Sequence, residues 1–288
     1  MSKVSDTFDT PKHATCPVCP HLCSLADGEL GFCHARRAEG GRVVDENYGR
    51  VTSLALDPIE KKPLARFMPG SKVLSVGSYG CNLRCGFCQN ASIAWAGPQD
   101  ASYRQIMPEE LVQLAVDTRP EGNVGIAYTY NEPLVGYEYV RDCSKLTHEH
   151  GLVNVVVSNG MINPGPLGEL LPLIDAANID LKGFTQGFYD MVDGSLDCVK
   201  STIEALARDS HCHLEVTTLV IPGLNDDPEE IAAAAQWLAS LDDSIVYHLT
   251  RFFPCHRFSD RQPTPVANIY ALADIPRNYL PHVYTGNC

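Results

Sequence analysis

Three cysteines stand close together in the segment SYGCNLRCGFCQN, residues 78–90, which we call the cysteine loop. Cys81, Cys85 and Cys88 follow the spacing C-x3-C-x2-C, and the loop also carries Asn, Arg, Gln and Gly. Buried structural cysteines are found among apolar neighbours, so a metal site explains this loop better. Three thiolates are one fewer than the four protein ligands of a closed zinc site.

Two kinds of metal site fit these three thiolates. A structural zinc ion would need a fourth ligand from elsewhere in the fold, such as His248 or His256. A [4Fe–4S] cluster would instead use three cysteines and leave one iron open. An open metal position is typical of a site that binds its substrate directly. We therefore expect a [4Fe–4S] cluster whose missing ligand comes from an exogenous molecule.

A second group of cysteines has the spacing C-x2-C-x3-C-x9-C near the start of the chain. Four thiolates are a closed ligand set for zinc, a mononuclear iron or an auxiliary [4Fe–4S] cluster, and His21 or His34 could replace one of them. The segment is short and rich in Pro and Gly, so a structural metal is the first expectation, while an auxiliary cluster could relay electrons. We call this set the N-terminal quartet: Cys16, Cys19, Cys23 and Cys33.

The composition of the chain bears on its expected partners and on its compartment. The 288 residues include 12 cysteines and carry a net charge of −13, so nucleic acid is not an expected partner. The polar start has no apolar run typical of a signal peptide, and no uncharged apolar stretch approaches the ~18 residues of a membrane span. We expect a cytoplasmic protein without membrane contact, in which clustered cysteines bind metal.

The rest of the chain must position these groups, and from residue 71 it alternates between two patterns. We therefore expect an α/β fold: a partial (β/α)6 barrel, TIM-like, over residues 71–288, with a Cys-rich N-terminal segment and lead-in strands over residues 1–70. The predicted strands are 72–78, 124–130, 152–160, 176–182, 213–223 and 244–254. The predicted helices are 108–118, 135–151, 167–174, 198–210 and 226–241.

Polar motifs follow the predicted strands, where such barrels place their chemistry. The cysteine loop follows the first strand, and TYNEP, SNG, DLK and IPGLND follow the next four, with HLTRF inside the sixth. Asp180 and Lys182 alternate along one strand and so point to one face. A charged pair inside a barrel costs desolvation unless it is used, which makes this pair a candidate for ligand binding.

The C-x3-C-x2-C spacing with an aromatic residue, Phe87, before the last cysteine resembles the radical S-adenosylmethionine (radical SAM) superfamily. The resemblance implies that SAM binds the open iron through its amino and carboxylate groups. It also implies that the reduced cluster cleaves SAM to a 5′-deoxyadenosyl radical, which abstracts a hydrogen atom. Longer matches, above all DPIEKKPL with the N-terminal quartet, resemble the AmmeMemoRadiSam-system radical SAM proteins over residues 16–287. Those proteins are similar to pyruvate formate-lyase-activating enzymes and continue with a further cysteine pair, whereas this sequence ends at Cys288.

The resemblance also implies roles for the strand-end residues. Asn131 and Glu132 would receive the SAM amino group, and Lys182 would meet its carboxylate, with Asp180 pairing to Lys182 or helping to hold a cation. A turn, a strand end or an ordinary core position would explain several of these residues equally well. The remaining implied contacts are the turn residues Ser158 and Asn159, the adenine contacts Val220 and Ile221, and the ribose contact His248.

Three functions remain open from the sequence. The first is an oxidoreductase-type activating enzyme that installs a glycyl radical on a partner protein, reduced by a flavodoxin- or ferredoxin-like electron donor. The second is radical modification of a small molecule or of a different protein. The third, a non-catalytic metal scaffold, is disfavoured because the motifs around Glu132, Lys182 and the cysteine loop are intact.

Overall fold

The computed structural model describes residues 13–209 and 211–288. Residues 1–12, on which the expectation about a signal peptide mainly rests and which belong to the predicted N-terminal segment, lie outside these ranges. Residue 210 of the predicted helix 198–210 also lies outside them. None of the helices within the described ranges is both long and apolar enough to cross a membrane.

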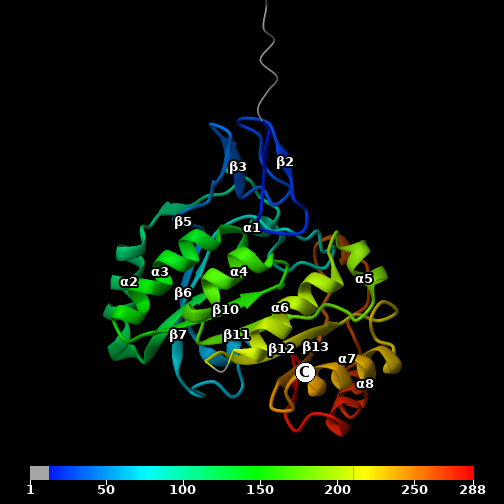
Figure 1. The fold of residues 1–288 in the computed structure, drawn as a ribbon. Coiled ribbons are helices and arrows are strands. Elements are labelled where there is room, and N and C mark those ends of the chain that lie inside the picture. The colour runs from blue at the N-terminus through cyan, green and yellow to red at the C-terminus, as the bar shows by residue number, and fades with distance from the viewer. Residues whose placement is uncertain (1–12, 210) are drawn as a thin grey trace, which may run out of the picture.

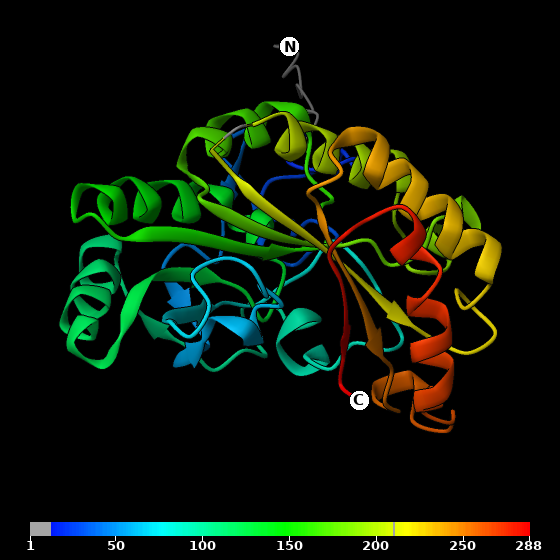
Figure 2. The ribbon, with the colours of Figure 1, turned by 90° about the horizontal axis from the view of Figure 1, so that it is seen from below.

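One curved sheet carries the fold, and six of its strands are the six that the sequence predicts. Neighbouring strands in this series are parallel throughout, which confirms the α/β fold and the partial barrel. The six strands form an arc with helices along its outer side (Figure 2). In chain order they are β7 (Lys72–Gly77), β9 (Asn123–Tyr128), β10 (Val153–Ser158), β11 (Ala176–Asp180), β12 (His213–Val220) and β13 (Val246–Arg251).

Two further strands extend this sheet at its edges. β6 (Ser53–Pro58) pairs antiparallel with β7, so part of the predicted N-terminal segment belongs to the main sheet. β14 (Val283–Gly286) pairs parallel with β13 and was not predicted, because its four residues are too short and too exposed to show a strand pattern.

The helices follow the strands and cover the outer face of the sheet (Figure 1). Proline begins several of them, and Asp227 caps α7 by accepting a hydrogen bond from the Glu229 N–H at 2.9 Å. The five predicted helices correspond to α2 (Pro108–Asp117), α3 (Tyr137–Glu149), α4 (Pro164–Leu170), α6 (Leu196–Arg208) and α7 (Pro228–Leu241). The others are α1 (Ala91–Ala94), α5 (Gln186–Met191) and α8 (Val266–Ala273), with short 3₁₀ turns that include η1 (Ile59–Lys61) and η3 (Pro133–Gly136).

One end of the barrel is closed by residues 59–67, which we call the plug segment. Ile59 and Leu64 are fully buried and pack against small and β-branched residues of β7, β9, β10 and β11. The backbone N–H groups of Ala65 and Arg66 donate to the Glu215 carboxylate on β12, each at 2.9 Å. Because the plug segment fills the interior from this side, the carboxyl ends of the strands form the open end.

The N-terminal segment projects from the barrel beside α1 (Figure 1). It consists of small two-stranded sheets, and the buried Arg36 fixes it to α3 through Glu138, with Nη2 and Oε1 at 2.7 Å. Its strands are β1 (Ala14–Thr15), β2 (Ser24–Leu25), β3 (Arg36–Glu39) and β4 (Arg42–Asp45), and β5 (Arg50–Val51) pairs with β8 (Arg104–Gln105).

Candidate active site

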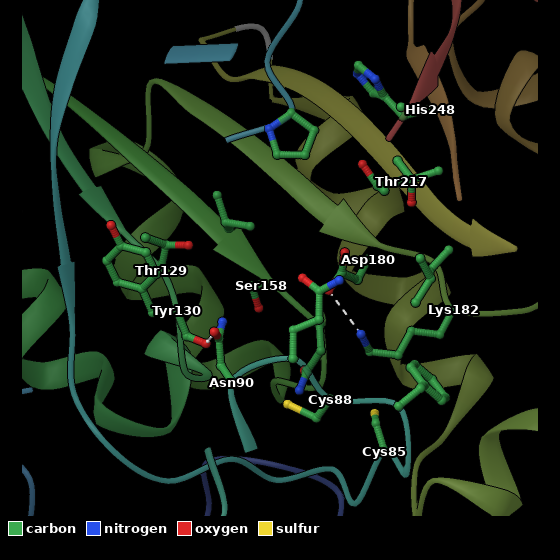
Figure 3. A pocket seen from close by; sticks show the side chains of 18 of the residues that line it. Cys85, Cys88, Asn90, Thr129, Tyr130, Ser158, Asp180, Lys182, Thr217 and His248 are labelled. Atoms are coloured by element: carbon green, nitrogen blue, oxygen red, sulfur yellow. Dashed lines mark hydrogen bonds and ion pairs between the residues drawn. The ribbon is translucent and has the colours of Figure 1, made fainter. Parts of the chain in front are cut away.

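A cavity of about 700 Å³ lies at the carboxyl ends of the parallel strands, and we call it the main cavity (Figure 3). This volume is within the range of small-molecule sites. Most of the predicted site residues line it together: Cys81, Cys85, Phe87, Cys88, Asn131, Glu132, Ser158, Asn159, Asp180, Lys182 and His248.

The cysteine loop presents its three thiols to the main cavity. The Cys81 thiol accepts hydrogen bonds from the Leu83 N–H at 3.4 Å and from Asn159 Nδ2 at 3.6 Å. Burial raises the pKa of the Cys85 thiol to about 11, while the nearby Lys182 ammonium acts in the opposite direction. Bound metal removes thiol protons, so three thiols that face one cavity from a single loop suit a metal-bound group.

The donor set fits a [4Fe–4S] cluster in its chemistry. Cysteine thiolates are the usual protein ligands of such clusters, and each cysteine binds a separate iron atom. Within residues 13–209 and 211–288, no group of three or more His, Cys, Asp or Glu side chains is arranged to hold a metal ion. A cluster makes a different demand, because its cysteines need not converge on one atom.

Asn131 fastens the cysteine loop to the end of β9. Its Oδ1 accepts a hydrogen bond from the Ser78 N–H at 2.9 Å. Its Nδ2 donates to the carbonyl oxygens of Tyr79 and Gly80, both at 3.1 Å. The amide therefore positions the backbone directly before Cys81.

Glu132 connects the ends of β9 and β10. It is buried and accepts hydrogen bonds from Ser158 Oγ at 2.7 Å, from the Asn159 N–H at 2.8 Å and from the Leu134 N–H at 3.0 Å. Burial nevertheless raises its pKa to about 7, and the negative charge of Asp180 acts in the same direction. A carboxylate in this position would be stabilised by a cationic ligand group in the main cavity.

Asp180 and Lys182 form an ion pair of 2.9 Å at the end of β11, which confirms that they share a face (Figure 3). The Lys182 ammonium lies 6.0 Å from the ring centre of Phe87. The pair therefore places a cation beside the cysteine loop.

His248 lies at the other side of the main cavity, on β13. Its Nε2 is 2.5 Å from Glu215 Oε2, and its ring stacks on Tyr284 with ring centres 5.5 Å apart. Glu215 is held by four hydrogen bonds in all, and their combined effect lowers its pKa to about 2. This network fixes the orientation of the imidazole.

Val220 and Ile221 do not line the main cavity. Both are fully buried in the core, and the lining residues from this segment are Thr217 and Leu219. Side chains alternate along β12, so residues 217 and 219 face inward while Val220 faces the helices. The structure therefore does not bring Val220 and Ile221 to the main cavity with the other predicted contacts, and their packing against adenine stays a prediction.

Several lining residues escaped the sequence analysis. Thr217 is buried, and its Oγ1 has no hydrogen-bond partner among the described residues. Tyr130 has a positive φ of 72° and donates its hydroxyl proton to Asp57 at 2.7 Å. Asn90 Nδ2 donates to the Tyr130 carbonyl oxygen at 2.8 Å. Half of the residues in the strand HLEVTTLV are polar, and this was the available signal that a side chain such as Thr217 faces a cavity.

The N-terminal quartet lines a separate small cavity, which we call the N-terminal cavity. All four cysteines are free thiols, and His21, Phe32 and Arg36 complete part of the lining. His34 does not line this cavity, because its Nδ1 pairs with the Trp95 carbonyl oxygen at 3.2 Å.

Comparisons with known proteins agree with this geometry. A profile of the Radical SAM superfamily matches residues 75–235. Uncharacterized protein MJ0808 of Methanocaldococcus jannaschii is 37% identical over 274 residues, which cover 94% of this chain and 80% of that protein. The pyruvate formate-lyase-activating enzyme of Clostridium pasteurianum is 23% identical over 169 residues, 56% of this chain and 67% of that enzyme.

Among solved structures, a radical SAM methyltransferase from Sphaerobacter thermophilus has a TM-score of 0.56 at 18% identity. The match covers 77% of this chain and 67% of that structure, and at this identity it supports the fold alone. The profile spans more than half of the chain and includes the cysteine loop and the ends of β9 to β12. The chain therefore belongs to the radical SAM superfamily, whose members are enzymes built around a [4Fe–4S] cluster and S-adenosylmethionine.

Proposed function

We propose that this chain cleaves SAM reductively and uses the resulting 5′-deoxyadenosyl radical to abstract a hydrogen atom from a protein substrate. The observation that carries the proposal is the convergence of three thiols from one loop with strand-end polar groups in a single cavity of about 700 Å³. Cys81, Cys85 and Cys88 would hold the [4Fe–4S] cluster, which supplies the electron for cleavage.

The side chains around the cluster site have charges that match the two ends of the methionyl group. Glu132, whose pKa burial raises, would be stabilised by the SAM ammonium. The Lys182 ammonium would attract the SAM carboxylate, while Asp180 keeps Lys182 in place at 2.9 Å.

The remaining contacts would bind the nucleoside half of SAM. His248, oriented by Glu215, lines the main cavity. Thr217 offers a hydroxyl that has no partner within the described part of the chain, so a polar group of SAM would satisfy it. The plug segment closes the opposite end of the barrel with buried apolar side chains.

A protein substrate is supported by similarity to the pyruvate formate-lyase-activating enzyme of Clostridium pasteurianum, which by its name acts on another protein. We propose a similar reaction, in which a backbone glycine of a partner loses its α-hydrogen. The electron would come from a flavodoxin- or ferredoxin-like protein.

The first experiment measures 5′-deoxyadenosine after anaerobic incubation of the iron-loaded chain with SAM and dithionite. We expect product from the wild type and none from Cys85→Ala. Cys212→Ala is the matched control, because this half-buried thiol lies at the other end of β12, outside both cavities, and its loss should leave cleavage intact. A wild-type chain that holds iron and SAM but forms no product contradicts the proposal, and so does cleavage by Cys85→Ala.

The second experiment addresses the substrate class. Deuterated cells provide a protein fraction and a small-molecule fraction, and each is added separately to the enzyme with unlabelled SAM. We expect deuterium in 5′-deoxyadenosine only with the protein fraction. Deuterium transfer only from the small-molecule fraction would assign the enzyme to small-molecule modification instead.

A further inference from the structure

We propose that the N-terminal quartet holds a second [4Fe–4S] cluster, which receives the external electron and passes it to the cluster on Cys81, Cys85 and Cys88. The electron-relay part of this proposal rests on the proposed function, whereas the presence of the second cluster does not.

The fold of the N-terminal segment brings its four cysteines to the lining of one small cavity. β1 and β2 pair with Ala14 opposite Leu25, so Cys16 directly follows β1 and Cys23 directly precedes β2. The Cys16 N–H donates to the Cys23 carbonyl oxygen at 2.9 Å. Together with Cys19 and Cys33 they line the N-terminal cavity.

The segment has only a small apolar core of its own. Its own apolar core consists of Ala14, Leu25 and Ala38, with Cys23 and Val43 packed against them. So small a core does not offset the entropy of ordering the segment, and small Cys-rich units are usually held by metal. Three of the four thiols are nevertheless almost fully buried, with exposures of 5–7%. A metal group bound to these thiols would supply the missing stability.

The position of the N-terminal cavity favours an electron carrier over a structural zinc ion. Residues that bear the two sets of thiols are in direct contact, because the Cys81 N–H donates to the Cys33 carbonyl oxygen at 3.2 Å. Gly80 makes this contact possible: its φ is +91°, and a Cβ there would lie 2.6 Å from the Cys33 carbonyl oxygen. A structural zinc ion needs no link to the catalytic loop, whereas an electron carrier does.

A second link runs through Asn82, next to Cys81. His21, which lines the N-terminal cavity, pairs through Nε2 with the Asn82 carbonyl oxygen at 2.8 Å. Asn159 Nδ2 lies 2.9 Å from Asn82 Oδ1 and 3.6 Å from the Cys81 thiol. The two sites are therefore joined both by backbone and by side-chain hydrogen bonds.

The segment also lies where an electron donor could reach it. It projects from the barrel (Figure 1), Cys23 is partly exposed, and its neighbour Leu22 is 53% exposed. A reduced flavodoxin- or ferredoxin-like protein would give one electron to the second cluster. The same electron would then pass to the first site and into SAM, where the bond between sulfur and C5′ breaks into methionine and the 5′-deoxyadenosyl radical. The second cluster returns to its starting oxidation state, so one electron enters and one is used.

Iron and sulfide analysis of the full chain, purified anaerobically, tests for the second cluster. We expect about eight iron and eight sulfide per wild-type chain, and about four of each in the triple variant Cys81→Ser/Cys85→Ser/Cys88→Ser. The triple variant leaves the N-terminal segment intact, so its iron reports on the quartet even if quartet variants fail to fold. The double variant Cys212→Ser/Cys288→Ser, which changes thiols outside both cavities, should keep the wild-type content. Zinc in the triple variant, or no metal at all, would overturn the proposal.

Electron paramagnetic resonance and cleavage rates test the relay. We expect the reduced wild type to show a magnetic interaction that is absent from the triple variant and from Cys16→Ser/Cys19→Ser. The latter should lose at least about tenfold in SAM cleavage driven by a reduced flavodoxin, and a smaller factor with dithionite, which reaches the first site directly. Equal losses with both reductants, or no loss with flavodoxin, refute the relay. If the wild type forms no 5′-deoxyadenosine with either reductant, the proposed function fails instead, while iron in the triple variant still reports on the second cluster.

Discussion

Replacing Glu215 by glutamine tests whether one buried carboxylate holds the plug segment and the active-site histidine together. Glu215 is completely buried on β12, between the plug segment and the main cavity. It accepts hydrogen bonds from the backbone of Ala65 and Arg66, from His213 and from His248, at 2.9, 2.9, 2.9 and 2.5 Å. Each carboxylate oxygen therefore serves one backbone donor and one imidazole.

The cost of the change follows from the pKa. These hydrogen bonds lower the pKa of Glu215 from 4.5 to about 2, and this difference corresponds to roughly 3 kcal/mol of stabilisation of the folded state at neutral pH. Glutamine keeps the size of the side chain but replaces one acceptor by an NH2 group, which would face a backbone N–H. We expect Glu215→Gln to lower the free energy of unfolding by about 3 kcal/mol and the thermal midpoint by roughly 6–10 °C.

The pH dependence separates a charge effect from a packing effect. The folded-state pKa of Glu215 lies below the unfolded-state value, so its stabilisation is present above pH 4.5 and is lost as the pH falls from 4.5 towards 2. The difference between wild type and Glu215→Gln should be largest at pH 6–8 and fall to about half or less at pH 3. Circular dichroism melts of metal-free wild type and variant measure this difference without interference from acid-labile metal sites.

A surface glutamate provides the control. Glu204 on α6 makes one ion pair with the exposed Arg208 at 3.3 Å, so Glu204→Gln should change the midpoint by no more than about 2 °C. The reasoning is refuted if Glu215→Gln shifts the midpoint no more than this control does. A shift of equal size at pH 7 and pH 3 would show that the charge of Glu215 is not responsible.

Three other substitutions test separate parts of the site. Gly80→Ala should lower the iron content of both sites and destabilise the fold by about 2 kcal/mol. The reason is that a Cβ on this left-handed backbone would lie 2.6 Å from the Cys33 carbonyl oxygen. An unchanged iron content would contradict this. Thr217→Val should weaken SAM binding about five- to tenfold in anaerobic calorimetry at constant iron content, since it removes a hydroxyl that has no partner among the residues the structure describes. An unchanged Kd would mean that SAM does not use this group. Lys182→Met should weaken SAM binding more than about tenfold, because it leaves the Asp180 carboxylate unpaired in front of the SAM carboxylate. The double variant Asp180→Asn/Lys182→Met should recover part of this loss. A double variant that binds SAM more weakly than Lys182→Met would refute this.

Hydrophobic patterning was sufficient to predict the barrel, because its strands and helices are long and regular. All six parallel strands and the five helices between them lie where the sequence predicts them, within a few residues at the ends. β14 escaped prediction because its stability comes from pairing with β13 along the open edge, and four half-exposed residues carry no periodic signal.

The grouping of the site residues could be predicted because parallel strands bring their carboxyl ends together. Their individual contacts could not be predicted. The Asn131 amide donates to the backbone before Cys81. The Glu132 carboxylate accepts a hydrogen bond from Ser158 at the end of β10, and both residues also line the main cavity. Val220 lies outside the main cavity because it alternates along β12 with Thr217 and Leu219, the residues that line it.

Residues from other parts of the chain hold the cysteine loop in place. Asn131 holds the backbone before Cys81, Asn159 donates to the Cys81 thiol, and the Cys33 carbonyl oxygen accepts from the Cys81 N–H. Three different parts of the chain thus fix one cysteine, two from strand ends of the barrel and one from the N-terminal segment. Because the last of these is itself a thiol-bearing residue of the quartet, any change that loosens the N-terminal cavity also reaches Cys81. The two groups of cysteines therefore form one connected structure, although the strands β3 to β7 and the plug segment lie between them in the sequence.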